Sequence, residues 1–548
     1  GTRGDQRASS PPAPSRRSGC RRGGRPPAPR PTVKTVSSEI LLTDRLLRSW
    51  LRCKRRAWLD RFGDAQQRQW TAHRELQLDE QRRGFSTLFP QRPGRGHAAV
   101  LAGAPAVVGL RLRGEGPVAS AVDLNGVSRA SQLRLEAHPP LLQRVEGSSR
   151  WGDHSYRPVL FRQGRNTTRE HRLVLALWGR LLSEEQQAPV RSGLVLAWAG
   201  RGLQQEALPL TGGLPRQLDE TLLKLAGDLA LPAPPPLVAD RKKCVLCGWR
   251  AACDQVAAAE GHLSEVSGIG AKRREMLLEL GIASLDQLAG ADPEQLAEAL
   301  AVHGEQHGEV ADQLVTQARV QRGGTALRRE AGPALPELAE APGVLIYDIE
   351  SDPDARDDFL HGFVLLERRP DGRWPDAAEA TSAPYRPMLA LLEHGEARLW
   401  QRLQRLLNAY PGWPLLHYGE TERLALVRLG QRQGASEREL AALRARLLDV
   451  HQRLRRHWWL PTNGYGLKAV AGWLGFRWRQ KGVDGARALL WWRRWRLGVG
   501  AGGRGSRHNL RWIFRYNHDD SLATWAVAHW LLAGDAGVTD PSGAQKTP

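Results

Sequence analysis

Two acidic residues follow a short apolar run in "VLIYDIES", residues 344–351, which sets Asp348 and Glu350 two positions apart. In a β-strand the side chains at positions i and i+2 point to the same face, so both carboxylates would lie side by side. Buried like charges are costly without a cation, and carboxylate oxygens are typical ligands of Mg²⁺ or Mn²⁺. The alternative is an exposed strand end that leads into the acidic loop "SDPDARDD". The pattern favours a divalent metal site.

Two further acidic motifs lie downstream of this strand. The stretch "PLLHYGETERLAL" carries Glu420 and Glu422 after an apolar strand end. The stretch "RYNHDDSLATWAV" sets Tyr516 and Asp520 four residues apart, which places them on one face of a helix. The chain therefore offers a D-x-E strand, a separated acid and a Y-x3-D helix.

This order of motifs resembles the DEDD 3′–5′ exonucleases of RNase H-like fold, in their tyrosine subgroup. The resemblance implies that four acids bind two divalent ions about 4 Å apart across the scissile phosphate. By position these acids are Asp348, Glu350, Glu422 and Asp520. It also implies that Tyr516 orients the attacking water. Because "HYGETE" departs from the usual N-x3-F-D motif, Glu422 takes the place of its Asp by spacing, and Glu420 is the alternative.

The segment "DVHQRLRRHWWLPTNGYGLKAVAGWLGF", residues 449–476, also resembles part of the bacterial YprB-type RNase H-like family. In it, Lys468 either contacts a backbone phosphate or is a solvated helix lysine. Tryptophans interspersed with arginines suit stacking on a single strand, although packing in the core is their commoner role. These tryptophans are Trp473, Trp478, Trp491, Trp492 and Trp495.

Four cysteines form the pattern C–(long gap)–C-x2-C-x5-C, namely Cys53, Cys244, Cys247 and Cys253. Four thiolates can hold a [4Fe–4S] cluster or a tetrahedral structural zinc. We rank the iron–sulfur cluster first, with zinc and then unligated thiols as alternatives. The fifth cysteine, Cys20, lies in the N-terminal tail and is expected to be uninvolved.

The cysteines enclose residues 39–255, a segment that resembles the iron–sulfur branch of the RecB-type PD-(D/E)XK nucleases. The active site of that family needs an Asp, a D/E-x-K and a Q-x3-Y. In this chain the D/E-x-K falls on Leu160, Phe161 and Arg162, and the Gln and Tyr positions hold Val174 and Trp178. We therefore expect a catalytically degenerate lobe with a structural or DNA-holding role.

Three other acids lie near these positions, namely Asp123, Glu146 and Asp153. None of them has a paired carboxylate in the sequence pattern. They are not assigned to a metal site.

The stretch "VSGIGAKRREMLLELGI", residues 266–282, resembles a helix-hairpin-helix, a sequence-independent binder of the DNA backbone. Gly268 and Gly270 permit a tight turn and close backbone approach. Amides at the next helix N-terminus can hold a phosphate, to which Lys272 and Arg273 add charge. The alternative is a helical hairpin that binds protein.

The chain of 548 residues carries a net charge of +21 and a pI near 10.6. Such a charge favours a polyanionic partner, because each phosphate contact releases condensed counterions. The alternative is that the arginine-rich composition partly reflects a GC-rich genome. No apolar run reaches the roughly 18 residues of a membrane span. Residues 1–34 alone hold nine basic residues and one acidic residue. We expect a soluble, cytoplasmic protein.

The elements that must position these residues indicate an α/β multidomain chain. We expect strands at 106–114 and 157–164 and an amphipathic helix at 168–186. The expected order is a disordered basic Pro/Arg-rich tail (1–38), a RecB-like restriction-endonuclease-type lobe (39–255), an all-α helix-hairpin-helix (256–302), a linker (303–342), an RNase H-like α/β exonuclease domain (343–533) and a flexible tail (534–548).

The leading interpretation is a nuclease that uses Mg²⁺ or Mn²⁺ to cleave DNA or RNA, with its active site in residues 343–533. The first alternative is a non-catalytic iron–sulfur scaffold that binds nucleic acid. The second is cleavage by the RecB-like lobe. The sequence does not indicate DNA or RNA as the substrate, nor a helicase or repair partner.

Overall fold

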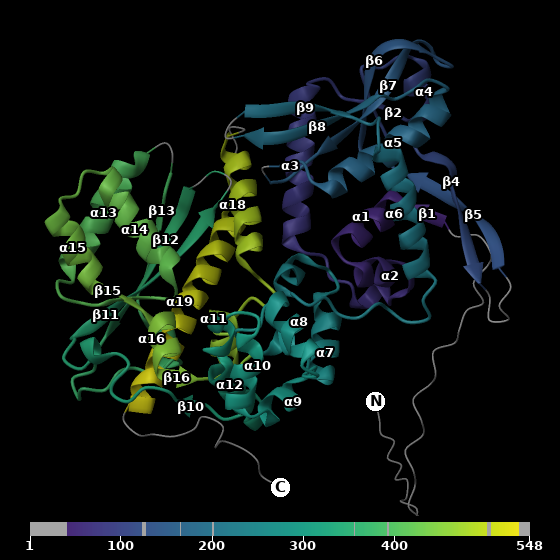
Figure 1. Ribbon diagram of the computed structural model, residues 1–548. Helices are drawn as coiled ribbons and strands as arrows, with labels where there is room; N and C mark the ends of the chain where they lie inside the picture. The colour runs from purple at the N-terminus through teal and green to yellow at the C-terminus, as the bar shows by residue number, and fades with distance from the viewer. Residues whose placement is uncertain are drawn as a thin grey trace, which may run out of the picture.

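The computed structural model describes residues 41–535, except 123–127, 165, 200–201, 354, 356, 392–393 and 501–505. The expected basic tail (1–38) with Cys20, as well as Asp123 and residues 536–548, lies outside the described residues. Figure 1 shows two α/β lobes with a smaller helical unit beside them. No described helix is long and apolar enough to cross a membrane.

The N-terminal lobe is built on a mixed six-stranded sheet with the strand order β2-β3-β6-β7-β8-β9. The strands are β2 (Gly94–Arg95), β3 (Ala106–Val108), β6 (Leu141–Ser149), β7 (Gly152–Phe161), β8 (Ser192–Ala199) and β9 (Gly202–Pro209). A second sheet contains β1 (Leu41–Thr43), β5 (Ser128–Ala137) and β4 (Leu112–Val122). The expected strand at 106–114 is thus divided between β3 and the start of β4.

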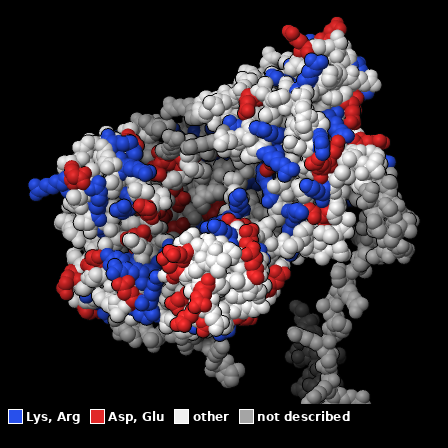
Figure 2. Space-filling model, in the orientation of Figure 1, with Lys and Arg blue, Asp and Glu red and all other residues white. Residues whose placement is uncertain are grey.

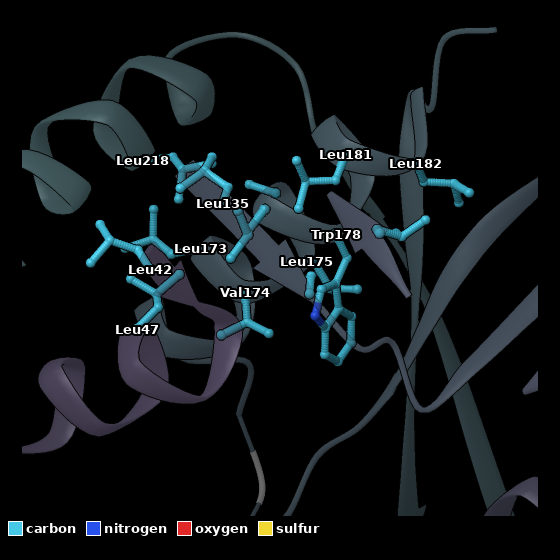
Figure 3. Packing of buried hydrophobic residues seen from close by; sticks show 14 of the residues in the cluster. Leu42, Leu47, Leu135, Leu173, Val174, Leu175, Trp178, Leu181, Leu182 and Leu218 are labelled. Atoms are coloured by element: carbon cyan, nitrogen blue, oxygen red, sulfur yellow. The ribbon is translucent and has the colours of Figure 1, made fainter. Parts of the chain in front are cut away.

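Helix α5 (Arg169–Gln186) links the parallel strands β7 and β8 and matches the helix expected at 168–186. Its residues 173–179 are all buried, which requires other elements to cover it on more than one side. Figure 3 shows this packing, in which Leu173, Leu175 and Trp178 of α5 belong to the same buried cluster as Leu42 and Leu47 from the start of the lobe. The remaining helices are α1 (Asp44–Arg52), α2 (Lys54–Phe62), α3 (Ala72–Leu88), α4 (Gly96–Leu101) and α6 (Leu214–Leu229).

The end of the lobe returns to its beginning. Residues between η2 (Lys242–Leu246) and α7 (Arg250–Glu260) contact the α2 region, where Trp249 Nε1 donates to Asp60 Oδ1 at 2.9 Å. The backbone N–H of Gln69 also donates to the Gly248 carbonyl at 2.8 Å. These contacts bring the segment of three cysteines beside the helix pair that carries Cys53.

The helical unit contains η3 (Leu263–Glu265), α8 (Ala271–Glu279), α9 (Leu285–Gly290), α10 (Pro293–Ala301), α11 (Glu305–Gly308) and α12 (Ala311–Gly323). The linker expected at 303–342 is wrong for its first half. Leu314, Val315 and Ala318 of α12 are buried in the same core as Leu277 and Leu288, so α12 completes the unit. After it, β10 (Leu327–Arg328) pairs with β16 (Trp458–Trp459), and η4 (Pro336–Leu338) follows.

The C-terminal domain has a five-stranded sheet with the strand order β13-β12-β11-β14-β15. The strands are β11 (Gly343–Asp352), β12 (Asp357–Glu367), β13 (Tyr385–Leu389), β14 (Leu415–His417) and β15 (Leu447–Asp449). β11 pairs antiparallel with β12 and parallel with β14, and its register with β12 shifts between Glu350 and Ser351.

Helices cover both faces of this sheet. One face packs on α13 (Gly395–Ala409), α14 (Glu420–Arg432) and α15 (Glu437–Arg446), and the other on α16 (Val450–His457), α17 (Leu467–Trp473) and the long α19 (Arg507–Asp535). Residues of β11 alternate between the two cores. Val344 and Ile346 pack with residues of α19, while Leu345 and Tyr347 pack with residues of α13 and α14. Asp348 and Glu350 continue this alternation and therefore lie on the face of β11 that packs on α19.

The two lobes meet through α3 and α18 (Gly485–Gly500), which lie side by side in the centre of Figure 1. Arg493 of α18 contacts both sides of this junction. Its guanidinium donates to both carboxylate oxygens of Asp352 on β11, at 2.9 and 2.7 Å, and also to Glu80 on α3, at 2.5 Å. Glu80 in turn accepts from Gln163 Nε2 at 2.9 Å.

Candidate active site

Three carboxylates converge between β11 and α19. Asp348, Glu350 and Asp520 each offer an oxygen, and these oxygens all lie within 4.8 Å of one another. In the part of the chain that the structure describes, this is the only such group of three or more acidic, histidine or cysteine ligands. Glu350 is buried, with 6% of its surface exposed, and the other two are half-buried. The strand does not end in solvent, contrary to the alternative weighed for it.

Helix α19 positions Asp520 together with Tyr516, one turn earlier. Tyr516 is 5% exposed, and its side chain is hydrogen-bonded to that of Asp520. Trp478 Nε1 donates to Asp520 Oδ1 at 2.6 Å. The carboxylate is thus oriented by two donors, of which the sequence pattern indicated only the tyrosine.

Asn517 is a residue of this site that the sequence analysis missed. Its Nδ2 donates to Asp348 Oδ2 at 2.7 Å, and its Oδ1 accepts from the Tyr385 hydroxyl at 2.8 Å. The side chain is fully buried. It fits because β12 carries Gly362 opposite it, where an added Cβ would lie 1.8 Å from Asn517 Oδ1. Only this contact could have drawn attention to it, since a single amide forms no sequence motif.

The two glutamates that are alternatives for the second acidic motif differ in their surroundings. Glu422, in the first turn of α14, is 8% exposed, and its Oε2 has no hydrogen-bond partner among the described residues. The side chain of Glu420 is 68% exposed and lies 3.6 Å from Arg423. Glu422 lies outside the group of three, but its charge contributes to raising the pKa of Asp348 and Glu350. It is therefore the acid that belongs to the neighbourhood of β11.

The site is electrostatically strained in the absence of cations. Burial, followed by the charges of Asp520 and Glu350, raises the pKa of Asp348 well above its usual range. Burial, followed by the charge of Asp520, raises the pKa of Glu350, and the positive charge of Lys468 partly opposes this increase. Burial also raises the pKa of Asp520, and it raises that of Glu422 to about 7. Buried oxygen donors that repel one another are a suitable ligand set for hard divalent cations. The residues therefore fit Mg²⁺ or Mn²⁺.

Lys468 lies beside this site, with its side chain exposed. Its Nζ is 5.0 Å from the centroid of the Tyr516 ring and donates to the Val483 carbonyl at 2.6 Å. The tryptophans pack within the domain, as in the commoner of the two roles weighed for them. Trp492 stacks on Phe359 with ring centroids 4.6 Å apart, and Trp473 packs edge-on against Trp530.

The glycine turn of the helical unit has the expected geometry. Gly268 has φ of +93°, a left-handed conformation that favours glycine. Gly270 caps α8 in extended conformation, and a Cβ there would meet no atom within 4 Å, so the N-terminus of α8 is open. Arg273 Nη1 donates back to the Gly268 carbonyl at 2.7 Å. Lys272 lies in the first turn of α8, beside Arg273.

Cys53, Cys244, Cys247 and Cys253 are unpaired and half-buried. Burial, followed by the charges of Cys247 and Cys53, raises the pKa of Cys244 to about 11. The pKa of Cys253 is also raised, first by burial, with Cys247 and Cys53 adding to the effect. The four thiols therefore lie within electrostatic reach of one another. Among the described residues they do not form a ligand group as tight as the carboxylates of Asp348, Glu350 and Asp520.

The positions expected to be degenerate in the N-terminal lobe belong largely to its core. Leu160 and Phe161 are buried on β7, and Val174 and Trp178 are buried on α5. Arg162 follows β7, and its backbone N–H pairs with β8. Glu146 and Asp153 lie on the β6–β7 hairpin, and among the described residues they join no metal-binding group.

Comparison with family models identifies two segments of the chain. Residues 345–532 match the model of the RNase H superfamily, and residues 260–300 match that of the SAM-like helix-hairpin-helix tandem. No curated protein matches the chain. Both segments lie outside residues 39–255, so the RecB-like resemblance of that lobe stays a prediction. The chain therefore combines a tandem helix-hairpin-helix domain with an RNase H superfamily domain, two types of domain that imply nucleic-acid binding, and the second supports a nuclease activity.

Proposed function

We propose that this protein is a metal-dependent 3′–5′ exonuclease whose active site lies in the C-terminal domain, in the manner of the DEDD enzymes and with YprB-type relatives. The observation that carries the proposal is the convergence of Asp348, Glu350 and Asp520 within 4.8 Å, on the face of β11 that packs on α19. Glu422 would complete the set of four acids.

Each side chain has a role that its surroundings support. Asp348, Glu350 and Asp520 would hold Mg²⁺ or Mn²⁺, with Glu422 on the neighbouring helix. Bound divalent ions would lower the pKa of an attacking water and stabilise the leaving 3′ oxygen. Burial raises the pKa of Tyr516 above its usual value, so its hydroxyl stays protonated and can orient that water by hydrogen bonding. Lys468, beside Tyr516, would contact a phosphate of the bound strand.

The helix-hairpin-helix would grip the substrate backbone without reading its sequence. The open N-terminus of α8 after Gly270 provides free backbone N–H groups, and Lys272 adds positive charge. DNA and RNA are both candidate substrates. A role in DNA repair, with a helicase as partner, is compatible with this arrangement.

The four cysteines would hold a [4Fe–4S] cluster that joins the two ends of the RecB-like lobe. The proposal is supported by the mutual electrostatic influence of the thiols and by the contacts of Trp249 and Gly248 with the α2 region. A single zinc bound at about 2.3 Å would require tightly grouped thiolates. Anaerobic purification with iron and zinc analysis tests this assignment. A colourless protein with one zinc and no iron would reject the cluster in favour of zinc.

A nuclease assay tests the main proposal. Single- and double-stranded DNA and RNA, labelled at the 3′ or 5′ end, are incubated with Mg²⁺ or Mn²⁺ and with wild type, Asp348→Ala or Asp520→Ala. We expect both substitutions to lower the rate by more than about 100-fold. Glu420→Gln, an exposed acid, serves as the matched control. Cleavage that survives both substitutions would place the active site elsewhere, and cleavage by none of the proteins would favour the scaffold.

A further inference from the structure

Five arginines gather on the N-terminal lobe, where three neighbouring helices meet. Helix α1 contributes three residues at spacings of three and four, which share one face of the helix. Helices α2 and α3 contribute one residue each. We call this set the arginine cluster, and it consists of Arg45, Arg48, Arg52, Arg56 and Arg74.

Asp60 places two of these side chains near each other, because its oxygens lie 4.0 Å from a nitrogen of Arg45 and from one of Arg56. The charges of the cluster also act on one another. Burial, and then Arg52, Arg56 and Arg45, lower the pKa of Arg74. Burial is also the main cause of the lowered pKa of Arg48, to which Arg52 and Arg74 add while Glu170 and Asp44 oppose it. Like charges held this close destabilise the fold unless anions compensate them.

The nearby carboxylates do not balance the cluster. Glu170 accepts two hydrogen bonds from Arg52, at 2.7 and 2.8 Å. Asp60 accepts from Ser49 and Trp249, and its oxygens are 4.0 Å from the nearest nitrogens of Arg45 and Arg56. The third acid, Asp44, accepts from the indole of Trp178 at 2.8 Å. Asp60 is thus shared among Arg45, Arg56 and, at 3.5 Å, Arg68 outside the cluster. Three carboxylates therefore face the five guanidinium groups of the cluster.

Arg48 is the arginine of the cluster that is best placed to receive an anion. Its guanidinium carbon lies 5.1 Å from the centroid of the Trp178 ring, and it makes no hydrogen bond or ion pair with any residue that the structure describes. It is half-buried. A guanidinium held on an aromatic face, with its donors unused, is pre-organised for a phosphate or carboxylate.

The positive region extends towards the end of β7 and the start of α5. Burial lowers the pKa of His171, in the first turn of α5, and Arg48, Arg52 and Arg162 lower it further. Figure 2 shows lysine and arginine side chains over the region of α1 and α3, beside the hollow that separates this lobe from the C-terminal domain. A ligand on the cluster would therefore lie beside that hollow.

We propose that the arginine cluster binds the phosphate backbone of a nucleic-acid strand, which it holds beside the C-terminal domain. The strand is taken to be the substrate of the proposed exonuclease, so the inference rests on that function. Arg45 and Arg52 are about 10 Å apart along the axis of α1, which is longer than one phosphate and suits successive phosphates of a strand. Arginine forks bind phosphate oxygens in pairs, which positions a strand without reading its sequence.

Binding without catalysis tests this site. The full chain in EDTA is titrated against a fluorescently labelled single-stranded DNA 20-mer and the RNA of the same sequence, with anisotropy read at several salt concentrations. We expect Arg48→Gln, Arg52→Gln and Arg74→Gln each to weaken binding several-fold and to lower the salt slope by about 0.7. Arg216→Gln, an exposed arginine on α6 that pairs with Glu220, is the matched control and should bind as wild type does.

The outcomes separate this inference from the proposed function. Wild-type affinity and salt slope in all three cluster variants would overturn it, as would equal displacement of the strand by polyglutamate. Arg74→Gln changes an exposed side chain that donates to Gln77 Oε1 at 3.2 Å, so it remains informative if Arg48→Gln unfolds. Hydrolysis of bis(p-nitrophenyl) phosphate with Mn²⁺, compared between wild type and Asp348→Ala, reports the active site independently of strand binding, and the Arg216→Gln control should match wild type. A protein that binds the strand but never hydrolyses either substrate would contradict the exonuclease and leave the cluster standing.

Discussion

Asn517 donates a hydrogen bond from its buried amide to Asp348, with 2.7 Å between Nδ2 and Oδ2. The same amide accepts from Tyr385 on the other side, so its orientation is fixed by strand β13. A carboxylate held in this way keeps one orientation within the site. The relationship explains why a residue that would touch no substrate is fully buried at the site.

We expect Asn517→Ala to lower kcat/KM by about 10- to 100-fold and to raise the Mg²⁺ concentration needed for half-maximal rate, as is usual for partners of metal ligands. Steady-state assays over a Mg²⁺ series measure both quantities. Asn463→Ala removes an exposed amide that binds Glu265 and should change neither. An unaltered Mg²⁺ requirement in Asn517→Ala would show that the amide does not position Asp348.

Glu422 and Glu420 provide a matched pair two residues apart. Glu422→Gln should lower the cleavage rate by more than about 100-fold, while Glu420→Gln should stay within about twofold of wild type, because only Glu422 is buried beside the acids. Without metal, Glu422→Gln should be at least as stable as wild type, since it removes a buried like charge. Thermal unfolding in EDTA measures this. Equal activity of the two variants would remove Glu422 from the site.

The junction between the lobes depends on Arg493. Its side chain is 19% exposed, and those of its partners Glu80 and Asp352 are 13% and 9% exposed. Arg493→Gln removes the cation that donates to both buried carboxylates, so we expect a loss of about 3 kcal/mol in the free energy of unfolding. Arg494→Gln, whose side chain is 47% exposed, should lose less than about 1 kcal/mol. Urea unfolding compares them, and similar losses would contradict a buried interlobe pair.

The helical unit should weaken in acid because of His262. Burial, with Arg274 and Arg241 nearby, lowers its pKa from 6.5 to about 4. Below pH 6.5 the unfolded state binds the proton more tightly than the folded state does. The contribution of neutral His262 to the free energy of unfolding is therefore complete above pH 6.5. It falls by about 3 kcal/mol as the pH falls towards 4. Protonation of Nδ1 would also remove the acceptor for the Ser264 N–H.

Amide hydrogen exchange in α8, measured between pH 7 and 4 and corrected for intrinsic rates, follows this loss. The pKa of His307, buried in the same unit, is shifted in the same direction, so the difference between wild type and His262→Gln isolates His262. A difference that does not change with pH would contradict the assignment.

Sequence reasoning worked where a pattern is local. The alternation of β11 predicted that Asp348 and Glu350 share a face, and the apolar periodicity predicted the helix at 168–186, although its residues 173–179 are buried on all sides and not on one face. It failed where tertiary contacts decide. The sequence predicts a linker where α12 forms, because the apolar side chains of α12 become buried only when they pack against α8 and α9, which lie elsewhere in the chain. Asn517 was missed because its role depends on the absent side chain of Gly362, on a distant strand.

Because the residues of β11 alternate between two faces, an error in the pairing of this strand would remove the metal site. A slip of one residue in its pairing with β12 and β14 would keep every backbone hydrogen bond available, yet would turn Asp348 and Glu350 into the core of α13 and α14. Tyr347 and Ile349 would then point towards Asp520. Such a chain would have the native strand content and no metal site. Cleavage activity would therefore report the alignment of this single strand more sensitively than any spectroscopic measure of secondary structure.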